Sequence, residues 1–280
     1  MSQKSNINSI SKIAYLGPEG TYSQLAALAF FGSDAQLLNC ASIDDVFAAV
    51  ENNQVAYGVV PVENSTEGAI NNTQDCLIDS STKIVGEQIL SIEHSLLVLA
   101  NTSKSDIKKV ASHKQSLAQC RGYLTKNFPE AEQVECPSNA EAAIRAQSDS
   151  GTAAIASELA GRLYNLQSLD KRIQDISNNC TRFLVLALED TSPTGSDKTS
   201  ILVYTENKPG ALFRVLEPFE YFQLSLTKIE TRPSKKEAWE YVFFIDFEGH
   251  ILDDLTTKLF TTLVQGGVEV KILGSYPLSK

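Results

Sequence analysis

Short, continuous apolar runs recur along the first two-thirds of the chain, and stretches with helical periodicity separate most of them. Runs at Lys12–Leu16, Leu37–Cys40 and Tyr57–Val62 predict strands, and Thr21–Phe31 and Asp44–Asn52 predict helices. Continuous apolar strands are typical of parallel sheets, which are covered on both faces. This alternation therefore predicts an α/β domain with parallel sheets.

Two crossovers divide this domain into lobes. Between Lys83 and Ala100 two apolar strands follow each other without a helix, and a second crossover is expected at Gln167–Asp175, before a strand at Phe183–Leu188. Further strands are predicted at 108–111, 133–136 and 153–156, and Ser42 with Asp45 and Ser138 with Glu141 have the spacing of capping boxes at helix starts. We expect a bilobal domain over residues 10–190 with a central cleft, in which lobe 1 comprises about 10–90 and 169–190 and lobe 2 about 91–168.

The pattern changes after a polar stretch of turn-forming residues at 191–198, which we interpret as a linker. Beyond it the predicted strands are 199–204, 224–231, 239–247 and 268–273, and the predicted helices are 209–222 and 253–264. The resulting order βαββαβ is that of ferredoxin-like domains. A second domain is therefore predicted over residues 199–280.

The composition agrees with a two-domain globular protein. The chain has 280 residues, which exceeds one typical domain. Hydrophobic residues make up 42% and charged residues 21%, as in ordinary globular chains. No apolar run approaches the roughly 20 residues that span a bilayer, and the first eleven residues are polar, without the apolar core of a secretory signal. We expect a cytoplasmic protein.

Charge and cysteine content exclude several classes of protein. A net charge of −10 disfavours nucleic acids and anionic membranes as partners. The odd number of cysteines and the lack of a Cys-x-x-Cys pair indicate reduced thiols rather than a disulfide framework. The three histidines are scattered and form no Cys/His cluster, so no metal site is predicted.

Two polar motifs follow strands of lobe 1. Gly17–Ser23 lies between a strand and a helix, where a helix N-terminus favours an anion, although an ordinary turn would have the same pattern. Glu63, Asn64 and Ser65 follow a buried strand, at the end where α/β sheets bind ligands. A capped turn is the alternative interpretation of this second motif.

Two further motifs belong to the rest of the first domain. Ser112 and Gln115 have the spacing of a capping box, and both would share one helical face with Gln119, which is plausible lining for the cleft. Thr181 and Arg182 open the last strand, where a hydroxyl beside a guanidinium suits a carboxylate or a departing hydroxyl. The alternative for this pair is a strand start with a surface arginine.

In this order the motifs resemble the signature motifs of prephenate dehydratases, from about Ile13 to Tyr276. Pro209–Leu212 and Glu230–Pro233 resemble the two effector motifs of the ACT regulatory domain in that family. Lys114 departs from the usual proline of the family. Residues 223–225 replace a common Gly-Ile/Val-Asn triplet, which puts the strength of phenylalanine control in doubt.

The resemblance implies a catalytic domain similar to type II periplasmic binding proteins, followed by an ACT domain. The implied reaction converts prephenate to phenylpyruvate, water and carbon dioxide in phenylalanine biosynthesis, with no cofactor. L-Phenylalanine would bind at an interface between two ACT domains of a homodimer or homotetramer. The alternatives are arogenate, the amino counterpart of prephenate, as the substrate, or a non-catalytic protein that binds a small anion.

The resemblance also implies three sets of site residues. In our hypothesis Thr181 hydrogen-bonds the leaving hydroxyl, Arg182 compensates substrate charge directly or through pairing with another side chain, and a water or a protonated Glu63 relays the proton. The implied catalytic set is Thr181, Arg182, Glu63, Asn64, Ser112 and Gln119, and the substrate-binding set is Gly20, Thr21, Ser23, Ser65, Gln115 and Phe183. The implied effector set is Gly210, Ala211, Leu212, Glu230, Thr231, Arg232 and Pro233.

Overall fold

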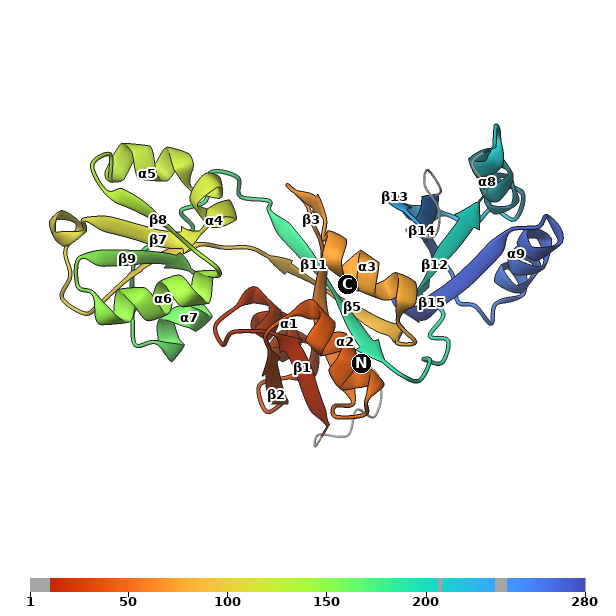
Figure 1. The fold of residues 1–280 in the computed structure, drawn as a ribbon, viewed down its shortest axis with the longest axis horizontal. Helices are drawn as coiled ribbons and strands as arrows, with labels where there is room; N and C mark the ends of the chain where they lie inside the picture. The colour runs from red at the N-terminus through yellow and green to blue at the C-terminus, as the bar shows by residue number, and fades with distance from the viewer. Residues whose placement is uncertain (1–10, 206–207, 235–240, 280) are drawn as a thin grey trace. The chain divides into compact units, whose positions relative to one another are not determined.

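The computed structural model describes residues 11–205, 208–234 and 241–279 (Figure 1). Its strands form three sheets with the orders β2-β1-β3-β11-β5, β10-β6-β9-β7-β8 and β13-β14-β12-β15, and β4 pairs with β3. The chain divides into two compact units. The first comprises residues up to 74 together with 88–183, and the second comprises 75–87 together with 184–280. No helix of the described residues is both long and apolar enough to cross a membrane.

The first sheet organises lobe 1 of the first unit. Strand β1 (Lys12–Leu16) pairs in parallel with β2 (Gln36–Cys40) and with β3 (Tyr57–Asn64), and α1 (Tyr22–Phe31) and α2 (Ile43–Glu51) pack against β1 and β3. The sheet is completed by β4 (Gly68–Ala69), β5 (Lys83–Ser91) and β11 (Cys180–Ala187), and α3 (Asn71–Asp79) lies between β4 and β5 in the sequence. The capping box predicted at the start of α2 is present.

The second sheet organises lobe 2. Its strands are β6 (Ser95–Val98), β7 (Lys109–His113), β8 (Glu132–Cys136), β9 (Thr152–Ala156) and β10 (Gln167–Lys171). Its helices are α4 (Lys114–Gln119), α5 (Arg121–Asn127), α6 (Asn139–Ser148) and α7 (Glu158–Leu163), with a short 3₁₀ turn η1 (Lys104–Asp106). The pairs β7–β8 and β7–β9 are parallel as predicted, whereas β6 pairs antiparallel with both β9 and β10. The second crossover region therefore includes a strand of lobe 2, which extends this lobe to residue 171.

The C-terminal part of the second unit has the predicted βαββαβ order. It consists of β12 (Asp197–Thr205), α8 (Ala211–Tyr221), β13 (Leu226–Pro233), β14 (Tyr241–Glu248), α9 (Asp254–Gln265) and β15 (Glu269–Pro277). Phe219 and Leu259 of the two helices pack on Ile201 and Phe247 of the antiparallel sheet. The predicted start of the third strand at residues 239–240 lies outside the described residues, as do residues 10 and 280 at the predicted domain ends.

Residues 75–87 of α3 and β5 fold with this C-terminal domain through charged side chains. The Lys271 ammonium donates to the carbonyl oxygens of Ile78 and Ser80 at 2.8 and 2.7 Å, where a cation satisfies the free carbonyls at the end of α3. The Lys198 ammonium lies 3.0 and 2.9 Å from the two carboxylate oxygens of Glu87. The compact unit therefore begins inside elements that the sequence assigns to the first domain.

The predicted linker is a hydrogen-bonded turn. The Asp197 carboxylate accepts from the amides of Thr194 and Gly195 at 2.8 and 3.0 Å and from the Thr194 hydroxyl at 2.6 Å. Asp197 and Lys198, the last two residues of that stretch, are buried and belong to β12. The polar composition of this stretch thus marks a tight turn at its centre and a strand at its end.

Candidate active site

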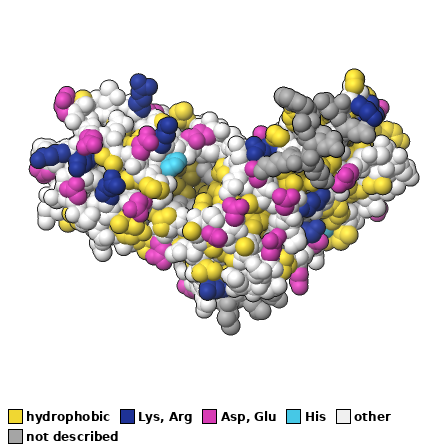
Figure 2. Space-filling view, viewed as in Figure 1, with side chains coloured by type: hydrophobic (Ala, Val, Ile, Leu, Met, Phe, Trp, Pro, Cys, Tyr) yellow, Lys and Arg dark blue, Asp and Glu magenta, His cyan; other side chains and the backbone are white. Residues whose placement is uncertain are grey.

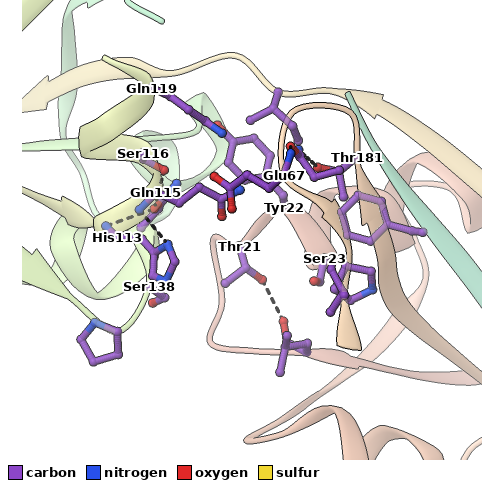
Figure 3. A pocket seen from close by; sticks show the side chains of 18 of the residues that line it. Thr21, Tyr22, Ser23, Glu67, His113, Gln115, Ser116, Gln119, Ser138 and Thr181 are labelled. Carbon is purple, nitrogen blue, oxygen red and sulfur yellow. Dashed lines mark hydrogen bonds between the residues drawn. The ribbon is translucent and has the colours of Figure 1, made fainter. Parts of the chain in front are cut away.

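A cavity of about 550 Å³ lies within the first unit and is lined by both lobes (Figure 3). Lobe 1 contributes the start of α1, the turn after β3, and β11, and lobe 2 contributes the starts of α4 and α6. The polar lining includes Thr21, Ser23, Asn64, Glu67, Gln115, Gln119, Asn139 and Thr181, with Phe183 beside them. This volume is in the range of pockets that bind small molecules.

Asn64 fixes the direction of the Thr181 hydroxyl. The Asn64 oxygen accepts from the Thr66 amide and hydroxyl at 3.0 and 2.6 Å, so its Nδ2 group must point the other way. That Nδ2 group donates to Asn179 Oδ1 at 2.8 Å and to Thr181 Oγ1 at 2.9 Å. The Thr181 oxygen is therefore occupied as an acceptor. Among the described residues no acceptor takes its hydrogen, which remains available to the cavity.

Hydrogen bonds within the protein also fix the orientation of the Gln119 amide. Its Oε1 accepts from Asn179 Nδ2 at 3.2 Å and lies 2.9 Å from His94 Nε2. Its Nε2 makes only a long contact, 3.5 Å, with the Thr66 hydroxyl among the described residues. The Gln119 side chain thus turns its acceptor into the protein and keeps a donor toward the cavity.

Asn139 repeats this arrangement at the first residue of α6. Its Oδ1 accepts from the Ser116 hydroxyl at 3.1 Å and from the His113 amide at 3.3 Å, and the Ser112 hydroxyl lies 3.3 Å away. Donors on its oxygen leave the Asn139 NH₂ group for the cavity that this residue lines. Thr181, Gln119 and Asn139 therefore present hydrogen-bond donors from both lobes.

The cavity is suited to an anion although no lysine or arginine of the described residues lines it. Two helices of at least ten residues, α1 and α6, begin at its wall, where free amides and the helix dipole favour negative charge. Two carboxylates, Glu67 and Glu141, also line it. Attraction for an anion would thus come from fixed donors and helix ends. On the face drawn in Figure 2, acidic and basic side chains are interspersed over the lobe that carries α5 and α6.

The structure contradicts the predicted direct roles of Arg182 and Glu63 at the cavity. Successive side chains of a strand point to opposite faces, so Arg182 points away from the face that carries Thr181 and Phe183. Arg182 Nη1 lies 3.0 Å from a carboxylate oxygen of Glu63, and neither residue lines the cavity. The hydroxyl and the guanidinium are neighbours in sequence but not in the site.

Ser112 is also placed differently from the prediction. Ser112 is not the N-cap of α4, because β7 continues through it to His113. His113 is the N-cap instead, and its ring nitrogen accepts from the Gln115 amide at 3.4 Å. The Ser112 hydroxyl is fully buried and donates to the carbonyl of Ile155 at 2.6 Å. Ser112 therefore supports Asn139 and does not line the cavity.

Two predicted substrate-binding residues, Gly20 and Ser65, have structural partners and do not line the cavity. The Gly20 amide donates to Gln24 Oε1 at 2.6 Å, and its carbonyl accepts from Ser157 at 3.1 Å. Gly20 has a φ of +87°, and a Cβ there would lie 3.1 Å from the Cβ of Ala160, so glycine permits close contact with α7. The Ser65 hydroxyl accepts from the Cys180 amide at 2.9 Å.

Tyr22, His94, Asn139 and Asn179 are among the lining residues that were missing from the sequence-predicted sets. Asn179 lies two residues before Thr181, so strand periodicity could have identified it. Tyr22 lies inside the Gly17–Ser23 motif, and Asn139 follows the predicted cap Ser138. No sequence signal identifies His94, which is 1% exposed and precedes β6. Burial lowers the pKa of His94 and raises that of Tyr22.

The predicted effector residues belong to the start of α8 and to β13 in the second unit. Gly210 is the N-cap of α8 with a φ of 76°, and Ala211 and Leu212 open the helix. Arg232, in β13, lies 2.8 Å from the Asp75 carboxylate. A second cavity of about 310 Å³ in this unit is lined by Ala211 but not by the other predicted effector residues. The described residues contain no group of three or more potential metal ligands.

Comparison with known proteins gives two family matches. Residues 13–191 match the prephenate dehydratase family model, and residues 199–263 match that of the ACT domain. The bifunctional chorismate mutase/prephenate dehydratase of Pseudomonas aeruginosa is 48% identical over 95% of this chain and 73% of its own length. The prephenate dehydratase of Methanocaldococcus jannaschii is 37% identical over 95% of this chain and 98% of its own.

Solved structures show the same similarity over the whole chain. The structure of GqqA, described as a novel type of quorum-quenching acylase, has a TM-score of 0.88 at 27% identity and covers 96% of this chain and 98% of its own. The prephenate dehydratase of Arthrobacter aurescens in complex with L-Phe has a TM-score of 0.87 at 29% identity and covers 95% of this chain and 90% of its own. The chain belongs to the prephenate dehydratase family and carries its ACT domain.

Proposed function

We propose that the protein converts prephenate to phenylpyruvate with loss of water and carbon dioxide. The observation that carries this proposal is the donor-lined cavity. Thr181, Gln119 and Asn139 all use their oxygens within the protein and leave donors for the ligand. Prephenate is a dianion rich in acceptor oxygens, so such a lining suits it better than it suits a ligand that offers donors.

The reaction balances without a cofactor. The bond between the ring carbon and its carboxylate breaks, and its electron pair enters the ring as carbon dioxide leaves. The ring becomes aromatic and expels the hydroxyl at the opposite carbon. One proton converts that hydroxyl to water, so each turnover consumes one proton and the dianion becomes a monoanion. The protein needs to bind the carboxylates, assist the departing hydroxyl and limit solvation of the ring carboxylate.

Thr181 supplies the donor for the departing hydroxyl. A threonine hydroxyl is too weak an acid to give up its proton permanently, so it acts as a fixed hydrogen bond and passes a proton that enters from solvent. Glu63 is poorly placed for this transfer because it is paired with Arg182 outside the cavity lining. Thr181 therefore acts with water as its proton source.

The other residues that line the cavity have two functions, binding carboxylates and excluding water. Gln119 and Asn139 from lobe 2 and the first turn of α1, with Thr21 and Ser23, bind carboxylate oxygens. Apolar side chains at the same cavity, among them Ile92 and Phe183, exclude water around the ring. A carboxylate that is poorly solvated loses carbon dioxide more readily.

L-Phenylalanine regulates the reaction through the ACT domain, at an interface between the ACT domains of two copies in a cytoplasmic homodimer or homotetramer. The ion pair between Arg232 and Asp75 supports this proposal because Arg232 belongs to an effector motif and Asp75 to α3. Helix α3 begins two residues after β4, which closes the turn that carries Thr66 and Glu67. An effector that biases the state of this helix would alter the cavity wall by its differential affinity for the two states.

A steady-state assay for phenylpyruvate from prephenate, with and without L-phenylalanine, tests both proposals. Arogenate is offered in parallel, and preferential turnover of arogenate would replace the substrate assignment while leaving the reaction type intact. A non-catalytic binding protein would show saturable prephenate binding without carbon dioxide release. Turnover of prephenate that is unaffected by L-phenylalanine would remove only the regulatory proposal.

A further inference from the structure

His94 is buried and titratable, and the reaction described above leaves it without a role. Its ring Nδ1 lies 3.0 Å from the Tyr22 hydroxyl, and its ring Nε2 lies 2.9 Å from Gln119 Oε1. The two rings meet edge to face, with centroids 5.8 Å apart. Tyr22 belongs to α1 of lobe 1 and Gln119 to α4 of lobe 2. His94 thus joins a side chain of each lobe at the cavity wall.

The hydrogen bonds around Gln119 determine the tautomer of His94. Asn64 points its NH₂ group at Asn179 Oδ1, so Asn179 must donate to Gln119 through Nδ2. That contact identifies the Gln119 atom near the ring as Oε1, an acceptor. The facing His94 Nε2 must therefore carry hydrogen. In the neutral ring Nδ1 then carries no hydrogen, and it lies 3.0 Å from the Tyr22 hydroxyl, which donates its own hydrogen to the Glu93 carbonyl at 2.6 Å.

We propose that His94, in the Nε2–H tautomer that the facing Gln119 oxygen requires, is a positioning residue that keeps the Gln119 amide turned with its NH₂ group toward the substrate. This inference rests on the proposed function, because it assigns Gln119 a donor role toward the dianion. His94 itself touches no substrate atom in this role. It acts through Gln119 alone.

The opposite tautomer would reverse this arrangement. With hydrogen on Nδ1, the Nε2 lone pair of His94 would face Gln119 Oε1, and the Gln119 amide would have to rotate. Its NH₂ group would then face both His94 and the NH₂ group of Asn179, which loses the 3.2 Å contact. The oxygen of Gln119 would face the cavity and repel a carboxylate.

Variants of His94 test the inference by rescue. His94→Leu removes the donor to Gln119, and we expect kcat/KM for prephenate to fall about 10–100-fold, as when a buried hydrogen-bonding partner is removed. His94→Gln restores an amide donor at the reach of Nε2, and we expect activity within about threefold of wild type. His250→Leu is the matched control, since His250 is also 1% exposed but lies in the second unit. It should leave kcat/KM without phenylalanine unchanged.

A double-mutant cycle shows whether His94 acts through Gln119. In a Gln119→Leu background, His94→Leu should cause no further loss of kcat/KM, because the group it positions is gone. Losses that multiply would show that His94 acts elsewhere. Equal impairment of His94→Leu and His94→Gln would show that ring packing matters rather than the donor. Either result overturns the inference while leaving prephenate turnover by the wild type, and so the proposed function, intact.

The tautomer of His94 provides a second measurement that needs no substitution. Nitrogen chemical shifts of the His94 ring should report the Nε2–H tautomer in the wild type, because Gln119 Oε1 faces Nε2 at 2.9 Å. An Nδ1–H tautomer in the wild type would overturn the inference even where the His94 variants fail to fold.

Discussion

The Thr181 hydroxyl is poised as a donor because the Asn64 amide already occupies its oxygen at 2.9 Å. Thr181→Ala should therefore lower kcat by about 10²–10⁴-fold, the usual contribution of a positioned proton-transfer group. Thr181→Ser keeps the hydroxyl and should retain most of the activity. Phenylpyruvate formation at saturating prephenate measures both. An alanine variant with wild-type kcat would remove Thr181 from the chemistry.

Glu67 brings negative charge to a cavity that is proposed to bind a dianion. It lies in the turn after β3 and is exposed to solvent, so its repulsion is present but screened. Glu67→Gln should lower KM for prephenate by about two- to fivefold with little change in kcat. The effect should shrink at high salt. A KM that rises instead would indicate that Glu67 binds the substrate through a donor or a bridging water.

His94 makes stability depend on pH in a definite direction. Burial lowers its pKa in the folded chain below the ordinary value of 6.5, so the unfolded chain binds more protons below that pH. The stabilisation is complete above about pH 6.5 and is lost as pH falls toward the folded-state pKa. Urea unfolding between pH 7 and 5 should show a steeper loss of stability for the wild type than for His94→Gln. Parallel pH profiles for the two proteins would refute this assignment.

For single residues, the sequence predicted which residues line the cavity better than it predicted which way their side chains point. Thr181, Asn64 and Gln119 were predicted from their density in motifs after strands, and all three line the cavity. Arg182 was misplaced because neighbouring residues of a strand point to opposite faces of the sheet, which a motif of adjacent residues does not show. His94 could not be found, because its importance arises from Tyr22 and Gln119, which are distant in sequence and meet only in the fold.

Asp75 of helix α3, which follows the cavity wall in the sequence, forms an ion pair with Arg232 of the proposed effector motif. Asp75 and Arg232 are 2.8 Å apart, and their side chains are 26% and 19% exposed, so solvent screens the pair only partly. Asp75→Asn should weaken inhibition by L-phenylalanine at least about fivefold, the lower end of typical allosteric coupling, and should leave kcat without effector unchanged. The inhibition curve of each variant measures this.

Asp79→Asn is the matched control for that prediction. Asp79 is exposed and ends the same helix, so its loss changes the helix charge equally without removing the Arg232 contact. L-Phenylalanine should inhibit the Asp79→Asn variant as strongly as it inhibits the wild type. If both variants lose inhibition alike, helix charge and not the ion pair transmits the signal.

Element boundaries were largely predictable because periodicity and capping act locally. The predicted and observed spans of β1 are identical, and Ser42 caps α2 as expected. The start of α4 was missed by one residue because His113 uses its ring nitrogen as the cap, while Ser112 satisfies a carbonyl inside the sheet. Choosing between two capping residues requires the tertiary partners, which short-range patterns do not contain.

At the scale of the molecule, the polar turn and the compact units give different boundaries. Composition places the change of domain at 191–198, and the family models end and begin at 191 and 199. The compact unit nevertheless takes in residues 75–87. The order of elements along the chain determines the boundary at 191–198. The extent of the compact unit is determined instead by Lys198, Lys271 and Arg232, which bind groups more than 100 residues away in the sequence. No pattern within a short window could predict those partners.

Breaking the Lys198–Glu87 pair should therefore destabilise the second unit strongly. Both side chains are buried, at 9% and 4% exposure, so removing one charge leaves the other without its counter-ion in a poorly solvated place. Glu87→Gln should lower the free energy of unfolding by about 3–5 kcal/mol. The exposed Glu158–Lys171 pair is the matched control, and Glu158→Gln should cost less than about 1 kcal/mol. Urea unfolding followed by two probes measures both, and equal effects would mean that the buried pair is hydrated in solution and that residues 75–87 are held to the ACT domain by other contacts.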